Sequence, residues 1–340
     1  MNVRTVRNCA LCVIALAILT FIFILLDLSW AGDSNLSLSQ VWAALTGNGT
    51  WATDIIVNRN NMPRIAIGVF VGAGLAVTGA VMQAVFRNPL ATPYILGLSS
   101  GASLGAALAI MFSIPLIPLA IAQPVMAFFT CMLTMILVYS ISRSGGGVRT
   151  ETLVLAGVAV SSLISAIVSF LTYIAPSEEM QSIVFWSMGS LGAVKMEQIT
   201  VVAPVIIVGI VLMLTQSRNL NAMMLGDAHA MDLGIDVRKI RLGLLVVSSI
   251  VVAAAVAFVG TIGFIGLVIP HIFRLILGPD NRIIMPISAL GGAAFIIMCD
   301  YISHVVAPMY GVLPIGVVTA LIGAPFFIYL LCSKKKEVGW

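Results

Sequence analysis

Ten apolar segments, each close to the length that crosses a lipid bilayer, constrain this chain more than any other feature. A helix needs about 20 residues, at about 1.5 Å each, to cross the roughly 30 Å hydrocarbon core. The segments lie at residues 9–28, 64–85, 95–112, 121–142, 152–173, 198–216, 242–260, 262–278, 283–301 and 313–332. They predict an all-α, polytopic membrane protein with about ten transmembrane helices, organised as one transmembrane domain over residues 1–340.

The composition agrees with this class and excludes a soluble globular domain. Hydrophobic residues make up 60% of the chain and charged residues only 9%, and the mean hydropathy is +1.13. The first apolar segment is too long for the apolar core of a signal peptide, so we expect an uncleaved first span. For residues 260–282, where three glycines interrupt the apolar run, a full span and a re-entrant segment both remain open.

The basic residues predict which side of the membrane each loop faces. If the N-terminus is cytoplasmic, only three of the 17 Lys and Arg residues fall on the outer side, namely Arg59, Arg64 and Lys195. Cytoplasmic loops of membrane proteins carry an excess of Lys and Arg. We therefore expect a multi-pass protein of the cell membrane with both termini in the cytoplasm, a basic inner loop at 143–150 and a basic tail at Lys334–Lys336.

Two polar segments interrupt the apolar pattern. In the outer segment, Leu38–Leu45 predicts a short surface helix that begins at Ser37 or Ser39, because serine caps helix N-termini. The inner segment at 218–241 predicts short amphipathic helices, with glycines as breaks and Asp227 at a helix start. Its Met and Leu side chains suit docking into the groove of a partner protein, and a solvated loop is the alternative.

Several patterns that resemble enzyme or metal sites are excluded by their context. Gly97–Gly101 matches GxSxG, but that motif requires a preceding strand, and the chain contains no GxxxxGK[ST] phosphate loop. Cys9 and Cys12 open a membrane span without a second pair, and the three histidines lie in separate segments. We expect no catalytic residue, no metal site, no cofactor bound by this chain and no nucleic-acid partner.

An ion-coupled secondary transporter is a further alternative. Such proteins place acidic groups near the middle of the membrane to bind the coupling ion. Here Asp27, Glu151 and Asp300 all lie near the ends of predicted spans, and the other acidic residues lie in loops. The sequence therefore favours this alternative less than transport powered by a partner.

A set of motifs identifies the family that this chain resembles. Between about residues 38 and 332 the sequence resembles the FecCD family of ABC-importer permeases, which take up vitamin B12, haem and iron–siderophore complexes. The motifs occur in the family's order and spacing: Pro63-Arg64, Asn88-Pro-Leu-Ala91, Ile95-Leu-Gly-Leu-Ser99, Gly260-Thr-Ile-Gly-Phe-Ile-Gly-Leu-Val-Ile-Pro-His-Ile-Phe-Arg274 and Leu313-Pro-Ile-Gly316 through Pro325. The resemblance implies ten helices per subunit and two permease subunits around a central path.

The resemblance also implies partners and a substrate class. A binding protein would dock outside, two ATP-binding-cassette ATPase subunits would dock inside, and ATP would be bound by those subunits only. We expect a homodimer of the permease rather than a heterodimer. The expected substrate is an iron–siderophore, haem or cobalamin-type metal chelate, and a small oxyanion such as molybdate is the alternative.

Site residues follow from the resemblance position by position. The corresponding Leu-Gly-acid stretch of the family forms the coupling helices that contact the ATPase, here Leu225, Gly226, Asp227, Ala228, Ala230, Leu233 and Gly234. The cytoplasmic gate is expected at Asn88, Leu90 and Thr150, and the docking surface for the binding protein at Arg59, Arg64 and His304. Small and hydroxyl side chains of the fifth and tenth spans are expected to line the path: Ser161, Ser162, Ser165, Ser169 and Thr319.

The outer face departs from the family pattern at three positions. Asn61 stands where an arginine is usual, His304 stands where many relatives have arginine, and Val312 replaces a common acid. Arg59 lies close enough in sequence to compensate for Asn61.

Overall fold

The computed structural model describes residues 3–31, 34–112, 116–143, 150–192 and 194–334, and helices dominate all of these ranges. The α-helices are α1 Val3–Ser29, α2 Leu38–Leu45, α3 Trp51–Asp54, α4 Met62–Val85, α5 Leu98–Met111, α6 Leu119–Arg143, α7 Thr150–Ile174, α8 Ser177–Met188, α9 Met196–Thr215, α10 Ser217–Met224, α11 Asp227–Asp232, α12 Val237–Val259, α13 Ile265–Leu277, α14 Asn281–Val305, α15 Ala307–Tyr310 and α16 Ile315–Lys334. A π-helix, η1 Ile55–Asn61, precedes α4, and a 3-10 helix, η2 Pro93–Leu96, precedes α5. The strands β1 Trp30–Ala31 and β2 Ser34–Asn35 pair antiparallel.

The predicted class is confirmed, because each of the ten predicted spans coincides with a described helix. Seven helices in the described part of the chain are long and apolar enough to cross a membrane. Three further apolar helices, α5, α13 and α16, account for the remaining segments. The predicted loop at 144–149 and the last two lysines of the predicted tail lie outside the described residues.

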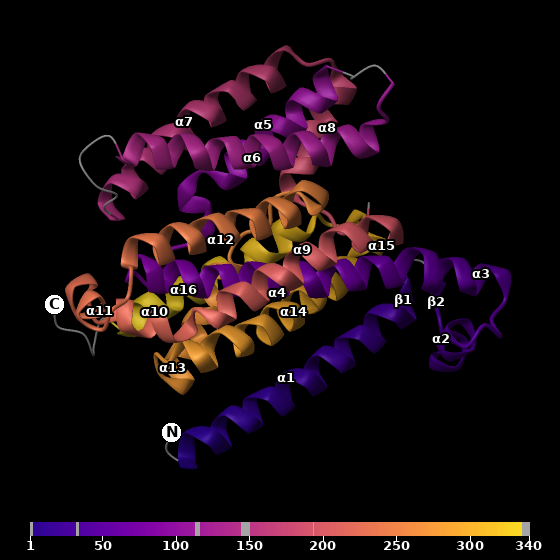
Figure 1. The fold of residues 1–340 in the computed structure, drawn as a ribbon. Coiled ribbons are helices and arrows are strands. Elements are labelled where there is room, and N and C mark those ends of the chain that lie inside the picture. Colours follow the sequence, from indigo (N-terminus) through magenta and orange to yellow (C-terminus); the bar gives the residue numbers. More distant parts are fainter. Residues whose placement is uncertain (1–2, 32–33, 113–115, 144–149, 193, 335–340) are drawn as a thin grey trace.

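The helices α4 and α14 form the centre of the bundle (Figure 1). They approach closely because glycine faces glycine: a Cβ atom added to Gly72 would overlap the backbone of Gly292, and one added to Gly292 would overlap that of Gly72. Gly79 of α4 meets Gly266 of α13 in the same way. Small residues permit such contacts between membrane helices, where dispersion forces replace the hydrophobic effect as the driving force.

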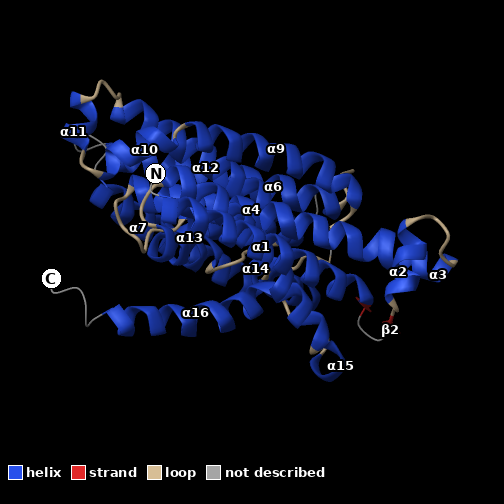
Figure 2. Cartoon of the chain, turned by 90° about the horizontal axis from the view of Figure 1, so that it is seen from below, coloured by secondary structure: helices blue, strands red, loops and turns tan. Residues whose placement is uncertain are grey.

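Two groups of helices cover this centre. The helices α5, α6, α7 and α8 pack together as a layer on one side, joined to the centre through α12, while α1 packs along α14 on the other (Figure 1). Figure 2 shows α16 along one edge of the bundle, where it contacts α13 and α14.

The two ends of the bundle carry different elements, in agreement with the predicted sidedness. Both termini lie at the end that carries α10 and α11, whereas α2, α3 and α15 lie at the opposite end (Figures 1 and 2). The surface helix α2 begins as predicted: the Ser37 side chain accepts from the Gln40 backbone and the Gln40 side chain accepts from the Ser37 backbone, which is a capping box.

The structure also decides between the alternatives for residues 260–282. Residues 260–264 are not helical, with Gly260 at φ +73° and Phe264 at φ +68°. The helix α13 that follows has 13 residues, or about 20 Å at 1.5 Å per residue, which is less than the hydrocarbon core. This segment is therefore an irregular stretch followed by a helix that is shorter than one full span. Such interruptions within a membrane protein occur where surrounding protein satisfies the backbone.

Candidate functional site

The inner polar segment forms the two short helices that its sequence predicts, α10 and α11. Leu220 and Met223 of α10 and Ala230 of α11 are fully buried and hold the helices against the bundle. Gly226 between them has φ +126° and Gly234 after them has φ +79°, in the left-handed region that favours glycine. Leu220, Met223 and Ala230 thus form the apolar face that an amphipathic helix packs against the interior of a protein.

Another set of apolar side chains on this segment points away from the protein. Leu225 is 72% exposed, Leu233 is 62% exposed, and Met231 is also exposed. These residues lie outside the candidate membrane spans. Ala228 and His229 are exposed beside them. Exposed groups of large apolar side chains mark surfaces that contact a partner protein or a membrane.

Side-chain amides clamp α10 to the loop between α13 and α14 and to the start of α14. The Asn221 side chain donates to Asp280 Oδ1 at 2.7 Å, and its oxygen accepts from both nitrogens of Asn281 at 2.8 Å. Arg274 Nη2 donates to Asn281 Oδ1 at 2.9 Å and to the carbonyl oxygen of Ala80 in α4 at 3.0 Å. The clamp joins α10 to three helices of the bundle.

Charge fixes the start of α11. Both oxygens of Asp227 accept from Arg241 Nη2, at 2.9 and 2.8 Å. Arg87 Nη2, in the turn after α4, lies 3.5 Å from Asp227 Oδ1. The sequence gives no sign that Arg87 and Arg241 contact Asp227. They lie 140 and 14 residues away from it, and pairs so far apart leave no local pattern.

The predicted gate residues lie at the same end of the bundle. The turn after α4 contains Asn88 and Leu90, both exposed, and Asn88 Oδ1 accepts from the Leu90 backbone at 2.9 Å. Thr150 is half-buried at the first position of α7. The 3-10 helix η2 packs against α7, since a Cβ atom at Gly157 would overlap the carbonyl oxygen of Ile95.

The predicted path residues divide into two groups. A cavity of about 220 Å³ lies between α5, α7 and α8, and Ser165 and Ser169 line it. Hydroxyl groups that sequence analysis did not predict complete its polar lining: Ser100, Ser103, Thr172 and Ser187. Ser162 of α7 is exposed, and its hydroxyl donates to the carbonyl oxygen of Val158. Ser161 of α7 lies close to Gly97, the residue that precedes α5.

Thr319 does not reach this cavity. It is fully buried and donates to the carbonyl oxygen of Gly316 in its own helix, α16, at 3.1 Å. In the single subunit the Thr319 hydroxyl is therefore bonded within its own helix and does not line an open surface.

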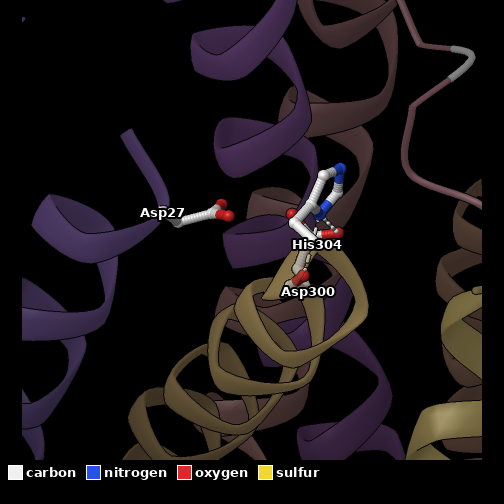
Figure 3. A group of neighbouring side chains, drawn as sticks. All are labelled: Asp27, Asp300 and His304. Carbon is white, nitrogen blue, oxygen red and sulfur yellow. Dashed lines mark hydrogen bonds and ion pairs between the residues drawn. The ribbon is translucent and has the colours of Figure 1, made fainter. Parts of the chain in front are cut away.

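The outer end of the bundle carries a buried charged cluster contributed by three helices. Asp27 of α1 and Asp300 and His304 of α14 lie together (Figure 3). Arg64 of α4 joins them: Nη2 is 3.0 Å from Asp27 Oδ1, Nε is 3.1 Å from Asp300 Oδ2, and Nη1 contacts His304 Nε2. The cluster links α1, α4 and α14 by charge as well as by packing.

The cluster does not fit a metal ion. Asp27, Asp300 and His304 could each offer a ligand atom, and those atoms lie within 4.8 Å of one another. The Arg64 guanidinium, however, already contacts all three residues and supplies a positive charge among them. A second cation would be repelled by that charge at close range in a low dielectric.

Two of the predicted docking residues belong to this buried cluster. Arg64 is only 5% exposed, and His304 is largely covered. In the single subunit the guanidinium lies between two carboxylates inside the bundle, and a docking role for Arg64 and His304 stays a prediction. The third predicted residue, Arg59, is exposed on η1.

Together, the fold and these features define a class: a multi-pass membrane protein with a short helical segment, α10 and α11, that exposes apolar side chains at one end of the bundle. Comparison with known proteins defines the family. The model of the FecCD transport family matches residues 16–333. The chain belongs to the FecCD transport family and is a transport subunit rather than an enzyme.

Named relatives and a solved structure agree with this assignment. The chain is 43% identical over 281 residues to the cobalamin import system permease protein of Halobacterium salinarum, covering 83% of this chain and 74% of that one. It is 38% identical to the hemin transport system permease protein of Yersinia pestis, covering 94% and 96%. A metal-chelate type ABC transporter in an inward-facing conformation matches with a TM-score of 0.84 and 31% identity, covering 94% and 98%.

Proposed function

We propose that this chain is the membrane subunit of an ATP-driven importer for a metal chelate. An ATPase would bind the segment 218–241 on the inner side, and hydrolysis of ATP on that partner would drive the transport cycle. The observation that carries the proposal is the geometry of α10 and α11. One apolar face anchors them in the bundle, and Leu225, Met231 and Leu233 are exposed in a segment that lies outside the candidate membrane spans.

The path would run along the hydroxyl-bearing face of α7. Ser162, Ser165 and Ser169 recur at intervals of three and four residues, so they share one helix face, and all three are exposed in the single subunit. A second copy of this chain would supply the opposite wall. Hydroxyl groups without charge hold a passing ligand weakly, which suits a path whose ligand is delivered by a separate binding protein.

Alternating access would follow from rigid-body movement. A displacement of the coupling helices can rock packed helices about an interface and open the path on one side at a time. On the outer face, Arg59 would contact an acidic residue of the binding protein. Two relatives are named for cobalamin and for hemin, which supports a metal chelate as the substrate class.

Purification and reconstitution test this function. The tagged permease is purified in mild detergent together with candidate ATPase and binding proteins, and uptake into liposomes is measured for cobalamin, hemin, a ferric siderophore and molybdate. We expect an ATPase at equal stoichiometry and ATP-dependent uptake of one chelate. Uptake of molybdate alone would contradict the chelate class, and uptake on an ion gradient without any ATPase would contradict the importer.

A further inference from the structure

The end of α4 and the start of α11 meet through one ion pair, Arg87–Asp227. The two Arg87 and Asp227 side chains are 44% and 35% exposed, and 3.5 Å separates Arg87 Nη2 from Asp227 Oδ1. Gly226 brings α11 this close: the atom nearest to a Cβ added there would be Arg87 Nη1, at 3.9 Å. A side chain at Gly226 would therefore stand against the guanidinium.

The backbone around Arg87 is tied closely to its neighbours. Arg87 has φ +50°, a conformation that side-chain-bearing residues rarely adopt. Its backbone nitrogen donates to the carbonyl oxygen of Ala84 at 3.2 Å, and that of Asn88 donates to Gln83 at 3.1 Å. Asn88 in turn bonds Leu90 through its side chain and Ala91 through its carbonyl oxygen. Because these bonds join consecutive residues, a displacement of the Arg87 side chain also displaces the Asn88–Leu90 turn.

The two coupling helices are attached to the bundle by different chemistry. The α10 clamp consists of Asn221 and Asn281, with Asn281 fully buried. The α11 contact consists of charges, with Arg241 on the α12 side of Asp227 and Arg87 on the α4 side. The amide hydrogen bonds to buried Asn281 keep one geometry, whereas the attraction between two opposite charges persists over a range of geometries, so Arg87 can stay with Asp227 while α11 moves.

We propose that Arg87 is a positioning residue that joins the coupling segment to the inner turn of the path, so that movement of α11 displaces Asn88 and Leu90. The inference rests on the proposed function, in which an ATPase moves α11. When the ATPase pulls α11 away from α4, the Asp227 carboxylate carries Arg87 with it, and the turn follows. When α11 returns, the pair holds the turn in its resting position.

The test removes the charge of Arg87 and keeps a polar, hydrogen-bonding side chain. Arg87→Gln is compared with wild type, with Arg87→Lys and with Arg7→Gln, which removes one positive charge from an exposed position near the start of α1, outside the proposed ATPase-binding segment. Each variant is reconstituted with its ATPase and binding protein, and ATP hydrolysis, uptake and ATPase co-purification are measured. We expect Arg87→Gln to retain the ATPase and hydrolysis but to lower uptake per ATP hydrolysed by about fivefold or more, as for coupling between sites.

A second readout follows the turn itself. Leu90→Cys is introduced into each protein, and its labelling by a membrane-impermeant maleimide is quantified by mass spectrometry of the peptide that carries residue 90, with and without ATP. We expect ATP to change the labelling rate in wild type and in the Arg87→Lys and Arg7→Gln variants, but not in Arg87→Gln.

The outcomes separate this inference from the proposed function. If Arg87→Gln matches Arg7→Gln in uptake per ATP and in nucleotide-dependent labelling, Arg87 does not link the two elements and the inference is wrong. If wild type neither retains an ATPase nor takes up a chelate with ATP, the proposed function is wrong, whatever the Arg87 variants do.

Discussion

At the scale of single residues, Arg64 has the most demanding environment in the described chain. Its guanidinium is buried between two carboxylates that come from helices far apart in sequence. Two acidic groups in an apolar bundle are tolerated here because the arginine balances charge and occupies the space between them. Removing one member of a buried ion pair leaves an uncompensated charge, which is far more unfavourable than never having had the pair.

Replacing Arg64 by methionine should therefore destabilise the fold strongly. Arg64→Met retains a long apolar side chain but leaves Asp27 and Asp300 without their cation, and we expect the free energy of unfolding to fall by about 3–5 kcal/mol. Unfolding in mild detergent measures it. Arg59→Met serves as the control, since Arg59 is exposed and should change stability by about 0.5 kcal/mol or less. Equal stability of the two variants would contradict the assigned role.

Asp280 provides a pH-dependent contact at the inner end. Hydrogen bonds from Arg282 lower the pKa of Asp280 from 3.8 to about 2, and Asn221 adds to this effect. Since the folded pKa is below the unfolded one, the ionised carboxylate stabilises the folded state above about pH 4. That stabilisation is lost as pH falls toward 2.

The variant Asp280→Asn isolates this contribution. Asparagine preserves the cap of α14 but has no charge to titrate, so its midpoint of thermal unfolding should lie below that of wild type at pH 5 and approach it as pH falls toward 2. Midpoints measured across this range check the expectation. A difference that grows on acidification would reverse the sign and rule out the assignment.

At the scale of elements, glycine decides where helices touch. Gly72 and Gly243 both lie inside long helices, yet Gly72 faces the Gly292 backbone, whereas no atom lies within 4 Å of a Cβ added at Gly243. The same residue type therefore has opposite consequences at the two positions, and only the neighbouring helix distinguishes them.

Alanine substitution should expose this difference. Gly72→Ala forces α4 and α14 apart, and we expect a loss of at least about 1–3 kcal/mol in the free energy of unfolding, as for overpacked cores. Gly243→Ala lies in open space within a helix and should gain about 0.5–1 kcal/mol. Both values come from unfolding in the same detergent. Equal losses for the two variants would show that the contact between α4 and α14 adds nothing to stability.

At the scale of the whole molecule, the two ends of the bundle should face opposite sides of the membrane. Trp51 of α3 is 82% exposed at one end, and Leu225 is 72% exposed at the other. A membrane-impermeant maleimide should label Trp51→Cys in cells whose inner membrane is accessible from outside, and Leu225→Cys only in inverted vesicles. Wild type, with its five native cysteines, gives the background. Labelling of both variants from one side would contradict the orientation.

The sequence alone was sufficient for features whose free energy is local. The spans follow from runs of apolar residues, since transfer of about 20 apolar side chains into lipid depends on those residues and little else. The cap at Ser37 and the glycine-bounded helices α10 and α11 follow from the same kind of reasoning, because a cap or a break is decided by a few adjacent residues.

Only the tertiary structure decided which distant residues meet. It placed Arg64 between Asp27 and Asp300, brought the hydroxyls of α5 and α8 to the cavity beside α7, and set Arg87 against Asp227. Contacts of this kind depend on how helices rotate and tilt when small residues allow them to approach, and no spacing along the chain encodes that choice. Local chemistry therefore determined the elements and their sidedness, and packing determined the sites.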